Sequence, residues 1–309
     1  MDRVTTFSAY NSVISNLMQS ELRQNTANVQ ISSGKVASDL KGFGVNAEAL
    51  TAAQTLKSRV EGFVSGIKNL SVKLDAQDLA LTEVGDSSQN ARAAIANAVA
   101  SGSGAGLMTS LQSYFGQATT ALNTQFNGHY LFSGGKVDTP PVGVQNLAAL
   151  TTTPPSGYFQ NDQLAATSRL DESTTVQTGV LASNVGTNLF NALASVQAFD
   201  QGPNGPFTSQ LTQPQIAFLT SMLPTFDSVG QGLTDVTASN GLMQSRVTQA
   251  QTTQQDRQTV LETMVGGITD VDIAEAASRL SQSQVALQAS AKIFASLQSS
   301  SLLNYLPTS

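Results

Sequence analysis

Two long stretches of the chain carry apolar residues at alternating intervals of four and three positions. The first runs from residue 56 to residue 98, about six heptads, and is interrupted by the polar residues Gln77 and Ser88. The second runs from residue 219 to residue 271. This spacing is typical of the apolar seam of a coiled coil, so we expect one long helix from each half of the chain, packed antiparallel within one molecule. The predicted seam residues are Leu56, Val60, Phe63, Ile67, Leu70, Leu74, Leu81, Val84, Leu219, Phe226, Val229, Leu233, Val236, Met243, Val247, Leu261 and Met264.

Three polar residues, Asn240, Gln254 and Arg257, interrupt the second seam. Polar seam residues can fix the register or the oligomeric state of paired helices. They can also lie at the rim of the seam, in contact with water, and this is the simpler interpretation.

The extreme ends of the chain carry sparser apolar stripes. We expect the second seam to break at Gly266-Gly267 and a new helix to follow, with Thr269 as its N-cap and Asp272 three positions further on. The faces of this helix and of the N-terminal stretch are too sparse to stabilise a helix alone, so we expect them to contact other subunits. The residues predicted for these contacts are Phe7, Ile14, Leu17, Met18, Leu22, Ile273, Leu280, Leu287, Phe294, Leu297, Leu302, Leu303 and Leu306.

Turn-forming residues are concentrated between residues 127 and 214, after a predicted helix at 107–126. Short strands are predicted at 129–132, 157–159 and 174–181, and a short helix at 188–199. This pattern indicates a small β-rich or α+β domain inserted between the two helical halves.

The expected fold is therefore mainly α-helical, with long antiparallel coiled-coil-like helices from both termini and one small inserted domain. We divide the chain into an N-terminal assembly segment (1–48), the N-terminal half of a helical rod (49–126), an inserted outer domain (127–214), the C-terminal half of the rod (215–266) and a C-terminal assembly helix (267–309).

Composition argues against several functions. Charged residues make up 12% of the 309 residues, the net charge is −6 and lysines and arginines form no run, which argues against nucleic-acid binding. The chain has no cysteine and a single histidine, His129, so it offers neither disulfides nor a histidine-based triad or metal cluster. No stretch approaches the ~20 apolar residues of a membrane span, and the N-terminus lacks the pattern of a secretory signal. These facts alone favour a soluble cytoplasmic protein.

No motif predicts a catalytic residue, a metal ligand or a cofactor. The run Ser133-Gly134-Gly135-Lys136 lacks the upstream glycine of a phosphate-binding loop, and we interpret it as a turn. Asp270, Asp272 and Glu275 resemble a weak calcium site, but acidic residues are also favoured in the first turn of a helix. We therefore expect a non-enzymatic protein.

Two short motifs resemble those of the flagellin family. Residues 30–35 (QISSGK) resemble the turn after the first helix of flagellin-like proteins, and residues 268–276 (ITDVDIAEA) resemble the start of their C-terminal helix. Residues 128–142 (GHYLFSGGKVDTPPV) and 301–306 (SLLNYL) are more similar to the hook-associated members of the family. The chain departs from the usual pattern in residues 36–44, where only Ser38-Asp39 of the common turn is kept.

The resemblance implies a structural subunit of the bacterial flagellum that leaves the cell by flagellar type III export, without a cleaved signal, and forms a ring between hook and filament. It implies contacts with further copies of the chain, with the first hook-associated protein, with flagellin and with an export chaperone, but with neither nucleic acid nor membrane. The terminal helices would line the inner tube and the central domain would face outward. A filament-forming flagellin is the alternative, and a surface ligand-binding role of the central domain is a further one.

Overall fold

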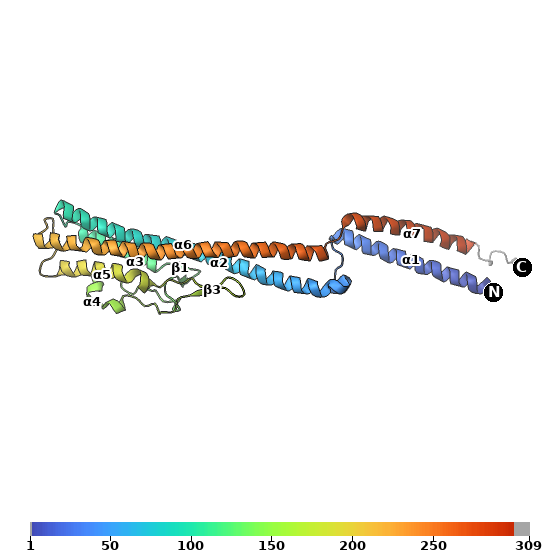
Figure 1. The fold of residues 1–309 in the computed structure, drawn as a ribbon, viewed down its shortest axis with the longest axis horizontal. Helices are drawn as coiled ribbons and strands as arrows, with labels where there is room; N and C mark the ends of the chain where they lie inside the picture. The colour runs from blue at the N-terminus through green and yellow to red at the C-terminus, as the bar shows by residue number, and fades with distance from the viewer. Residues whose placement is uncertain (1, 300–309) are drawn as a thin grey trace. The chain divides into compact units, whose positions relative to one another are not determined.

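The computed structural model describes residues 2–299 (Figure 1) and is mainly α-helical with two small antiparallel sheets, which confirms the expected fold class. In chain order its elements are α1 (Asp2–Ser33), η1 (Leu40–Asn46), α2 (Ala47–Ser101), α3 (Leu107–Leu122), β1 (Gln125–Phe126), β2 (His129–Tyr130), α4 (Ala149–Thr152), η2 (Pro155–Gly157), β3 (Thr167–Arg169), β4 (Thr175–Gln177), α5 (Ala182–Gln201), α6 (Gln213–Thr269) and α7 (Ile273–Ser299).

The chain divides into two compact units. One contains the described residues up to Arg59 and from Arg257 onward, and the other contains residues 60–256. Helices α2 and α6 contribute to both units, so the division falls inside these helices, whereas the boundaries expected from the sequence lay at residues 48 and 266.

Within residues 60–256, α2 and α6 pack side by side in opposite directions. Arg92 forms an ion pair with Asp227, and the Gln77 amide donates to Asn240 Oδ1 at 2.9 Å, so residue numbers fall along one helix as they rise along the other. Eleven of the predicted seam side chains are buried here, and three are half-buried. The buried ones are Val60, Ile67, Leu70, Leu74, Leu81, Val84, Leu219, Phe226, Val229, Leu233 and Val247, and the half-buried ones are Phe63, Val236 and Met243.

The seam is more open in the other unit. Leu56 on α2 and Met264 on α6 are 46% and 49% exposed, and Leu261 is half-buried. Close to half of the surface of each of the first two side chains is open to solvent. The heptad pattern therefore continues beyond the stretch in which α2 and α6 bury it.

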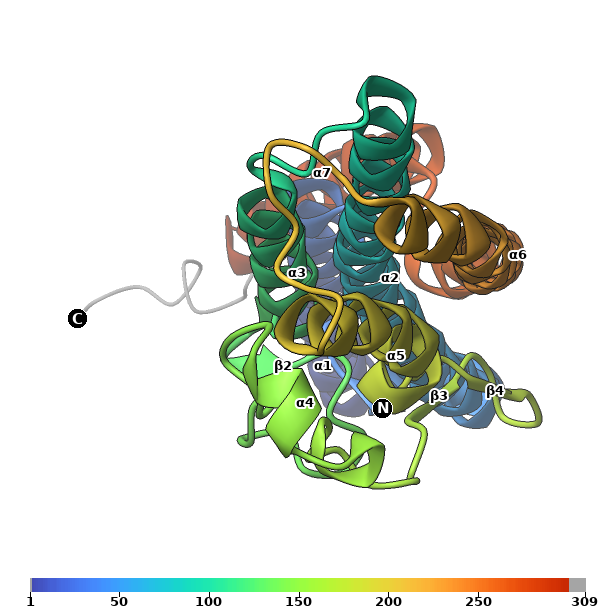
Figure 2. The same ribbon diagram turned by 90° about the vertical axis from the view of Figure 1, so that its left-hand side faces the viewer.

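A single apolar core joins α2, α3, α5 and α6 to the segment between them. The fully buried Phe190 on α5 lies 5.0 Å from the ring of Phe115 on α3 and 5.2 Å from that of Phe159. Figure 2 shows α2 between α3 and α6, with α5 alongside them. The segment 127–214 thus packs on the helices and has no separate core, because its two-stranded sheets are too small to cover the apolar face of α5.

The strands in this segment are shorter than the sequence predicted. β2 ends at Tyr130, because Leu131 and Phe132 turn into the core. Residues 157–159 form no strand: Gly157 ends the 3-10 turn η2, and Phe159 makes an isolated bridge to Val142. The hairpin β1–β2 turns at Asn127-Gly128, where both residues have positive φ, as a type I′ turn requires.

Two helices also differ in length from the prediction. α3 ends at Leu122 rather than 126, and α5 spans 182–201 rather than 188–199. The longer α5 matches burial, since Ala182 and Val185 in its first turns lie in the common core. Helix bounds read from periodicity alone are uncertain by a few residues at each end.

A second hairpin covers part of the α2–α6 seam. β3 pairs antiparallel with β4 in the register Ser168↔Val176, and Leu170 at its tip is buried against Ile67 and Val247. Asp171 holds the tip: its Oδ1 accepts from the backbone N–H groups of Ser173 and Thr174, both at 2.7 Å. These hydrogen bonds, that of Ser173 first, lower the pKa of Asp171 to about 2.

Candidate functional site: the terminal helix pair and its clasp

Helices α1 and α7, which carry the two ends of the described chain, pack closely along each other. The rings of Tyr10 and Phe294 lie 5.1 Å apart, and the small residues Ala27 and Ala276 are 2% and 0% exposed. Small side chains at a contact allow two helices to approach closely. The sparse stripes of the two ends therefore serve partly to join α1 and α7 within one chain.

The residues predicted to contact other subunits fall into three groups. Ile14, Leu17, Leu280, Leu287 and Phe294 are half-buried. Met18, Leu22 and Ile273 are 59%, 66% and 49% exposed, and contacts with neighbouring subunits stay a prediction for them. The side chains of Phe7 and Leu297, and all of Leu302, Leu303 and Leu306, lie outside the described residues.

A groove of about 460 Å³ runs between α1 and α7. Its walls include Ser20 and Ser283, whose hydroxyls donate to backbone oxygens of their own helices at 2.8 Å. The exposed Leu22 lies on its α1 wall. Arg23 and Arg279 also line the groove, so its surface is mixed, with apolar, polar and positively charged side chains.

The turn after α1 pairs with the end of α6 in a short antiparallel bridge. We call residues 30–36 and 266–272 the clasp. The Val36 N–H donates to the Thr269 carbonyl at 2.8 Å, and the Val271 N–H donates to the Gly34 carbonyl at 3.0 Å. Gly34, the first residue after α1, has a φ of +69°, the left-handed conformation that glycine favours at the end of a helix. This requirement explains the glycine of the QISSGK motif.

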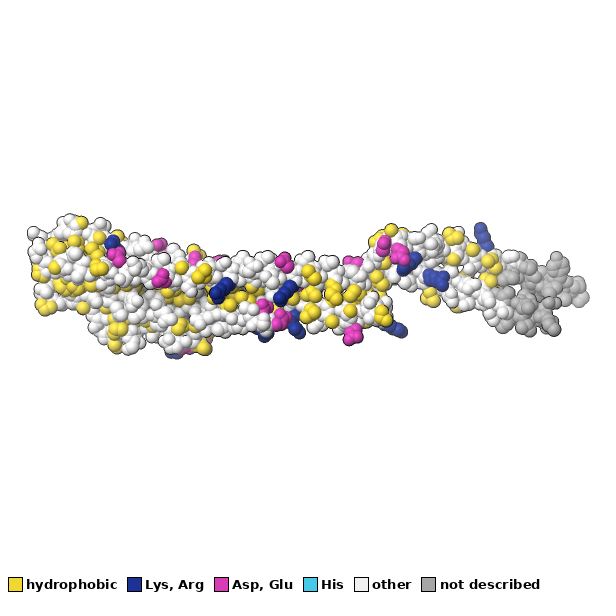
Figure 3. All heavy atoms as spheres, in the orientation of Figure 1, with side chains coloured by type: hydrophobic (Ala, Val, Ile, Leu, Met, Phe, Trp, Pro, Cys, Tyr) yellow, Lys and Arg dark blue, Asp and Glu magenta, His cyan; other side chains and the backbone are white. Residues whose placement is uncertain are grey.

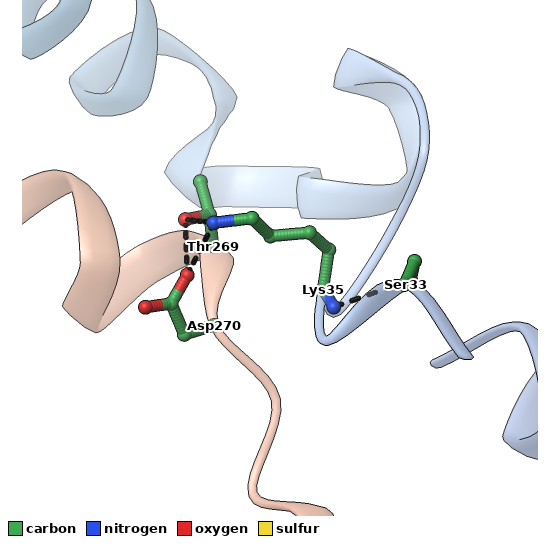
Figure 4. Close-up of polar contacts among 4 residues, drawn as sticks. All are labelled: Ser33, Lys35, Thr269 and Asp270. Carbon is green, nitrogen blue, oxygen red and sulfur yellow. Dashed lines mark hydrogen bonds and ion pairs between the residues drawn. The ribbon is translucent and has the colours of Figure 1, made fainter. Parts of the chain in front are cut away.

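Side chains reinforce the clasp (Figure 4). Lys35 Nζ lies 2.6 Å from Asp270 Oδ1 and 3.3 Å from Thr269 Oγ1, and the Thr269 hydroxyl donates to Asp270 Oδ1 at 2.9 Å. The hydrogen bond from Lys35, followed by that from Thr269, lowers the pKa of the Asp270 carboxyl. Beneath them the buried Gln30 amide donates to the Val36 carbonyl at 2.9 Å.

The predicted helix break and N-cap at this place were wrong. α6 continues through Gly266-Gly267 to Thr269, and the Asp270 N–H donates to the Gly266 carbonyl at 2.7 Å. Asp272, not Thr269, caps α7: its Oδ1 accepts from the N–H groups of Ala274 and Glu275 at 2.9 and 3.1 Å. Thr269 cannot act as the cap because its hydroxyl and carbonyl are used by the clasp.

Removing the ion pair should loosen the clasp. With Lys35→Met or Asp270→Asn we expect faster hydrogen exchange at the Val36 and Val271 amides, which donate across the bridge. Because the pKa of Asp270 is lowered by folding, its stabilising contribution is present above the ordinary Asp pKa of about 3.9 and is lost as the pH falls through the lowered value. Protection factors measured by NMR between pH 7 and pH 2 test both effects.

The matched control for the clasp is Lys41→Met, which removes an exposed lysine from the neighbouring η1. A charge exchange, Lys35→Asp with Asp270→Lys, should restore part of the protection. Equal exchange rates in the Lys35 and Lys41 variants would show that the ion pair does not stabilise the bridge.

Asn240 of the α2–α6 seam forms a buried hydrogen-bonded cluster with Gln77 and Asp78. Asn240 is 3% exposed; its Nδ2 donates to the Leu74 carbonyl at 3.2 Å and to Asp78 Oδ1 at 3.1 Å. Gln254 is 2% exposed, whereas Arg257 is exposed. The rim interpretation is therefore wrong for Asn240 and Gln254, because both side chains are buried. For Asn240, partners on α2 replace the hydrogen bonds to water.

The motif at 128–142 forms a loop held by polar contacts. His129 Nδ1 lies 3.1 Å from Asp138 Oδ1, and the Lys136 ammonium donates to the Gln160 carbonyl at 3.0 Å. The Gly135 N–H donates to Asp162 Oδ1 at 2.9 Å, which lowers the pKa of Asp162. Within residues 2–299, no group of three or more histidines and acidic residues is placed to hold a metal ion, and no helix is apolar and long enough to span a membrane.

The pairing of Lys35 with Asp270 could not be found from the sequence. Both residues lie in motifs that the sequence singles out, but 234 positions separate Lys35 from Thr269. Neither periodicity nor composition joins two turns that far apart. The only signal was that both residues lie in motifs that resemble the flagellin family.

A comparison with protein families found a match in the C-terminal part of the chain. Residues 224–306, which include the α6 side of the clasp and all of α7, match the bacterial flagellin C-terminal helical region. A search of curated proteins found no match.

Two solved structures share the fold. One, described as a flagellar hook-associated protein from Vibrio parahaemolyticus, is 18% identical with a TM-score of 0.59, and the match covers 72% of this chain and 97% of that one. The other, FlgL from Bacillus cereus, is 13% identical with a TM-score of 0.53, and the match covers 70% and 98%. The chain therefore resembles bacterial flagellins in its C-terminal helical region, residues 224–306, and shares its fold with a structure described as a flagellar hook-associated protein.

Proposed function

We propose that the chain is the junction subunit between the flagellar hook and the filament, equivalent to the third hook-associated protein. The carrying observation is the shared fold, which spans almost the whole length of the two similar structures. The loop at 128–142, which resembles the junction motif, supports the choice, since it is held in place by His129, Lys136 and Asp162. The proposed partners are further copies of the chain, the first hook-associated protein below, flagellin above and an export chaperone.

The proposed mechanism is mechanical. Residues 60–256 pack around one large apolar core and a smaller cluster on the α2–α6 seam, and a close-packed block of this kind can transmit torque with little change of shape. The clasp joins the turn after α1 to the turn between α6 and α7. The two terminal helices are therefore tied together at the ends that lie further from the chain termini. The exposed Met18, Leu22 and Ile273 remain available for neighbouring subunits in a ring. No catalytic step is required.

A filament-forming flagellin is the second candidate, favoured by the match at residues 224–306. Labelling distinguishes the two. In cells whose copy of the chain carries a surface tag at the exposed Ser156 of η2, immunogold electron microscopy should place label at the base of each filament only, because a junction ring contains few copies. Label along the whole filament would assign the chain as a flagellin.

A further inference from the structure

Two separate apolar clusters lie along the α2–α6 seam, with buried polar side chains between them. The members of the smaller cluster are Ile67, Leu70, Leu74, Leu170 and Val247. On α2, Gln77 lies between Leu74 and Ala80, which belongs to the large common core. On α6, Asn240 lies between Val236, which packs against the large core, and Met243, which packs against the smaller cluster. We call the contact between Gln77 and Asn240 the polar layer.

The polar layer is incompletely hydrogen-bonded. Gln77 is 1% exposed and its Nε2 donates to Asn240 Oδ1, but no group in residues 2–299 donates to Gln77 Oε1. The network fixes this orientation, because Asn240 Nδ2 donates to the Leu74 carbonyl and to Asp78 Oδ1 and only its Oδ1 remains for the amide across the seam. A buried acceptor without a donor is less stable than the same acceptor in water. Opening of the seam at this level would therefore regain a hydrogen bond.

The seam is also less closely packed at the polar layer. A groove of about 340 Å³ is lined by Gln77 and Asn240 together with Val236 and Met243, the side chains on either side of Asn240 that pack against different clusters. A gap at a contact removes the neighbouring atoms that dispersion attraction needs. Apolar contact between the two clusters is therefore weak at this level.

The smaller cluster ends at a second incompletely bonded polar side chain. Ala250 packs against this cluster from α6, and the next buried residue of α6 is Gln254, which is 2% exposed. Its Oε1 likewise has no donor among the described residues. The five buried side chains of the smaller cluster thus lie between two polar positions, and they supply much less apolar burial than the common core.

Surface charge gives this part of the seam no strong force of its own. Along the face shown in Figure 3, positive and negative side chains are intermixed rather than gathered by sign. Repulsion between like charges therefore does not push α2 and α6 apart, and the stability of the seam depends on its burial and its hydrogen bonds.

We infer that the polar layer divides the α2–α6 pair into two units that open independently. We call residues 67–74 of α2 and 243–250 of α6 the short seam. The short seam opens as one local unit while the large core around α3 and α5 stays folded, because it exposes only the smaller cluster and gives Gln77 Oε1 access to water. The layer thus places a compliant stretch beside a rigid one. This property belongs to the folded chain and does not depend on the junction role.

Native-state hydrogen exchange on the full chain, measured by NMR in low denaturant, tests the division. We expect the amides on both strands of the short seam to share one opening reaction. Their protection factors should be at least tenfold lower than those of residues 84–95, where α2 packs in the large core. A single opening free energy for the short seam and residues 84–95 would overturn the inference.

A double substitution, Gln77→Leu with Asn240→Leu, replaces the polar layer by an apolar contact between the clusters. The Leu74 carbonyl keeps its hydrogen bond from the Gln244 amide at 3.3 Å. The half-buried Asp78 keeps access to water, so neither group loses its last partner. Replacing both members of a buried polar pair by apolar side chains is neutral or stabilising, whereas replacing one leaves the other unpaired.

The double variant should raise the protection factors of the short seam at least tenfold, toward those of residues 84–95. Asn240→Leu alone should lower them, because Gln77 Nε2 then loses its acceptor. A folded double variant whose short seam is no better protected than in the wild type would overturn the inference. If the double variant does not fold, the comparison within the wild-type chain decides.

The matched control makes the same two changes at exposed positions of α2, Gln89→Leu with Asn90→Leu. It adds the same side chains without touching the polar layer, so the protection of the short seam should stay at the wild-type level. A rise equal to that of the double variant would assign the effect to added leucine rather than to the layer, and would also overturn the inference.

Discussion

Phe190→Ala is expected to lower the free energy of unfolding by about 3–5 kcal/mol, the usual cost of removing a large aromatic side chain from a core. Phe190 is 0% exposed, and its ring lies 5.0 Å from Phe115, 5.2 Å from Phe159 and 6.2 Å from Tyr158. It is therefore shared by α3, α5 and the segment that precedes α5. Denaturant unfolding of the full chain, followed by helical circular dichroism, measures the change.

The same experiment decides whether residues 127–214 are a domain of their own. A shared core predicts that the loss of Phe190 shifts the transition in which α2, α3 and α6 unfold. The control Leu164→Ala, in the same segment but exposed, should change the free energy by at most about 0.5 kcal/mol. Two separate transitions, with only the smaller one shifted, would show that the inserted segment folds independently.

Gly186→Ala is expected to destabilise the chain by about 1–3 kcal/mol through overpacking. A Cβ at this position of α5 would lie 2.7 Å from Phe159 Cζ and 2.9 Å from Leu122 Cδ1, inside the packed core. The usual gain from replacing a helical glycine with alanine, about 0.5–1 kcal/mol, is smaller than this cost.

Gly232→Ala is the matched control, since it also lies inside a helix, α6, but a Cβ there meets nothing within 4 Å. We expect this variant to be stabilised by about 0.5–1 kcal/mol. The two glycine substitutions should therefore have opposite signs in the same unfolding assay. A stabilising Gly186→Ala would mean that Phe159 and α5 are packed less tightly than described.

The long helices could be predicted because their signal is local and repeated. Residues such as Ile67, Leu74 and Val247 recur with heptad spacing, and they are buried where α2 and α6 pair. The spacing also continues through Leu56 and Met264, which are exposed. Periodicity identifies an apolar face, but it does not show whether a partner covers that face.

The clasp and the common core could not be predicted because they depend on contacts between distant segments. Lys35 and Asp270 meet only because the turn after α1 pairs with the turn after α6. In the same way, the turn-rich composition of 127–214 indicated an insertion but did not show that Phe190 packs against Phe115. The amide of Asn240 was assigned to the rim because its partners, Gln77 and Asp78, lie on the other long helix.

The resemblance added what the residues alone did not supply. Taken without the resemblance, the composition favoured a cytoplasmic protein. The motifs at 30–35 and 268–276 indicated the flagellin family instead. The structure explains both motifs physically, since Gly34 ends α1 in a left-handed conformation and Asp272 caps α7. The choice of the junction over the filament rests on residues 128–142 and 301–306, of which the second lies outside the described residues.

Deletion of the gene in its source bacterium tests the proposed function most directly. A junction subunit is needed to hold the first flagellin on the hook, so the deletion should leave intact hooks without filaments and release flagellin into the medium. The wild-type gene on a plasmid should restore the filaments. Filaments of normal number and length on the deletion strain, seen by electron microscopy, would contradict a role at the hook–filament junction.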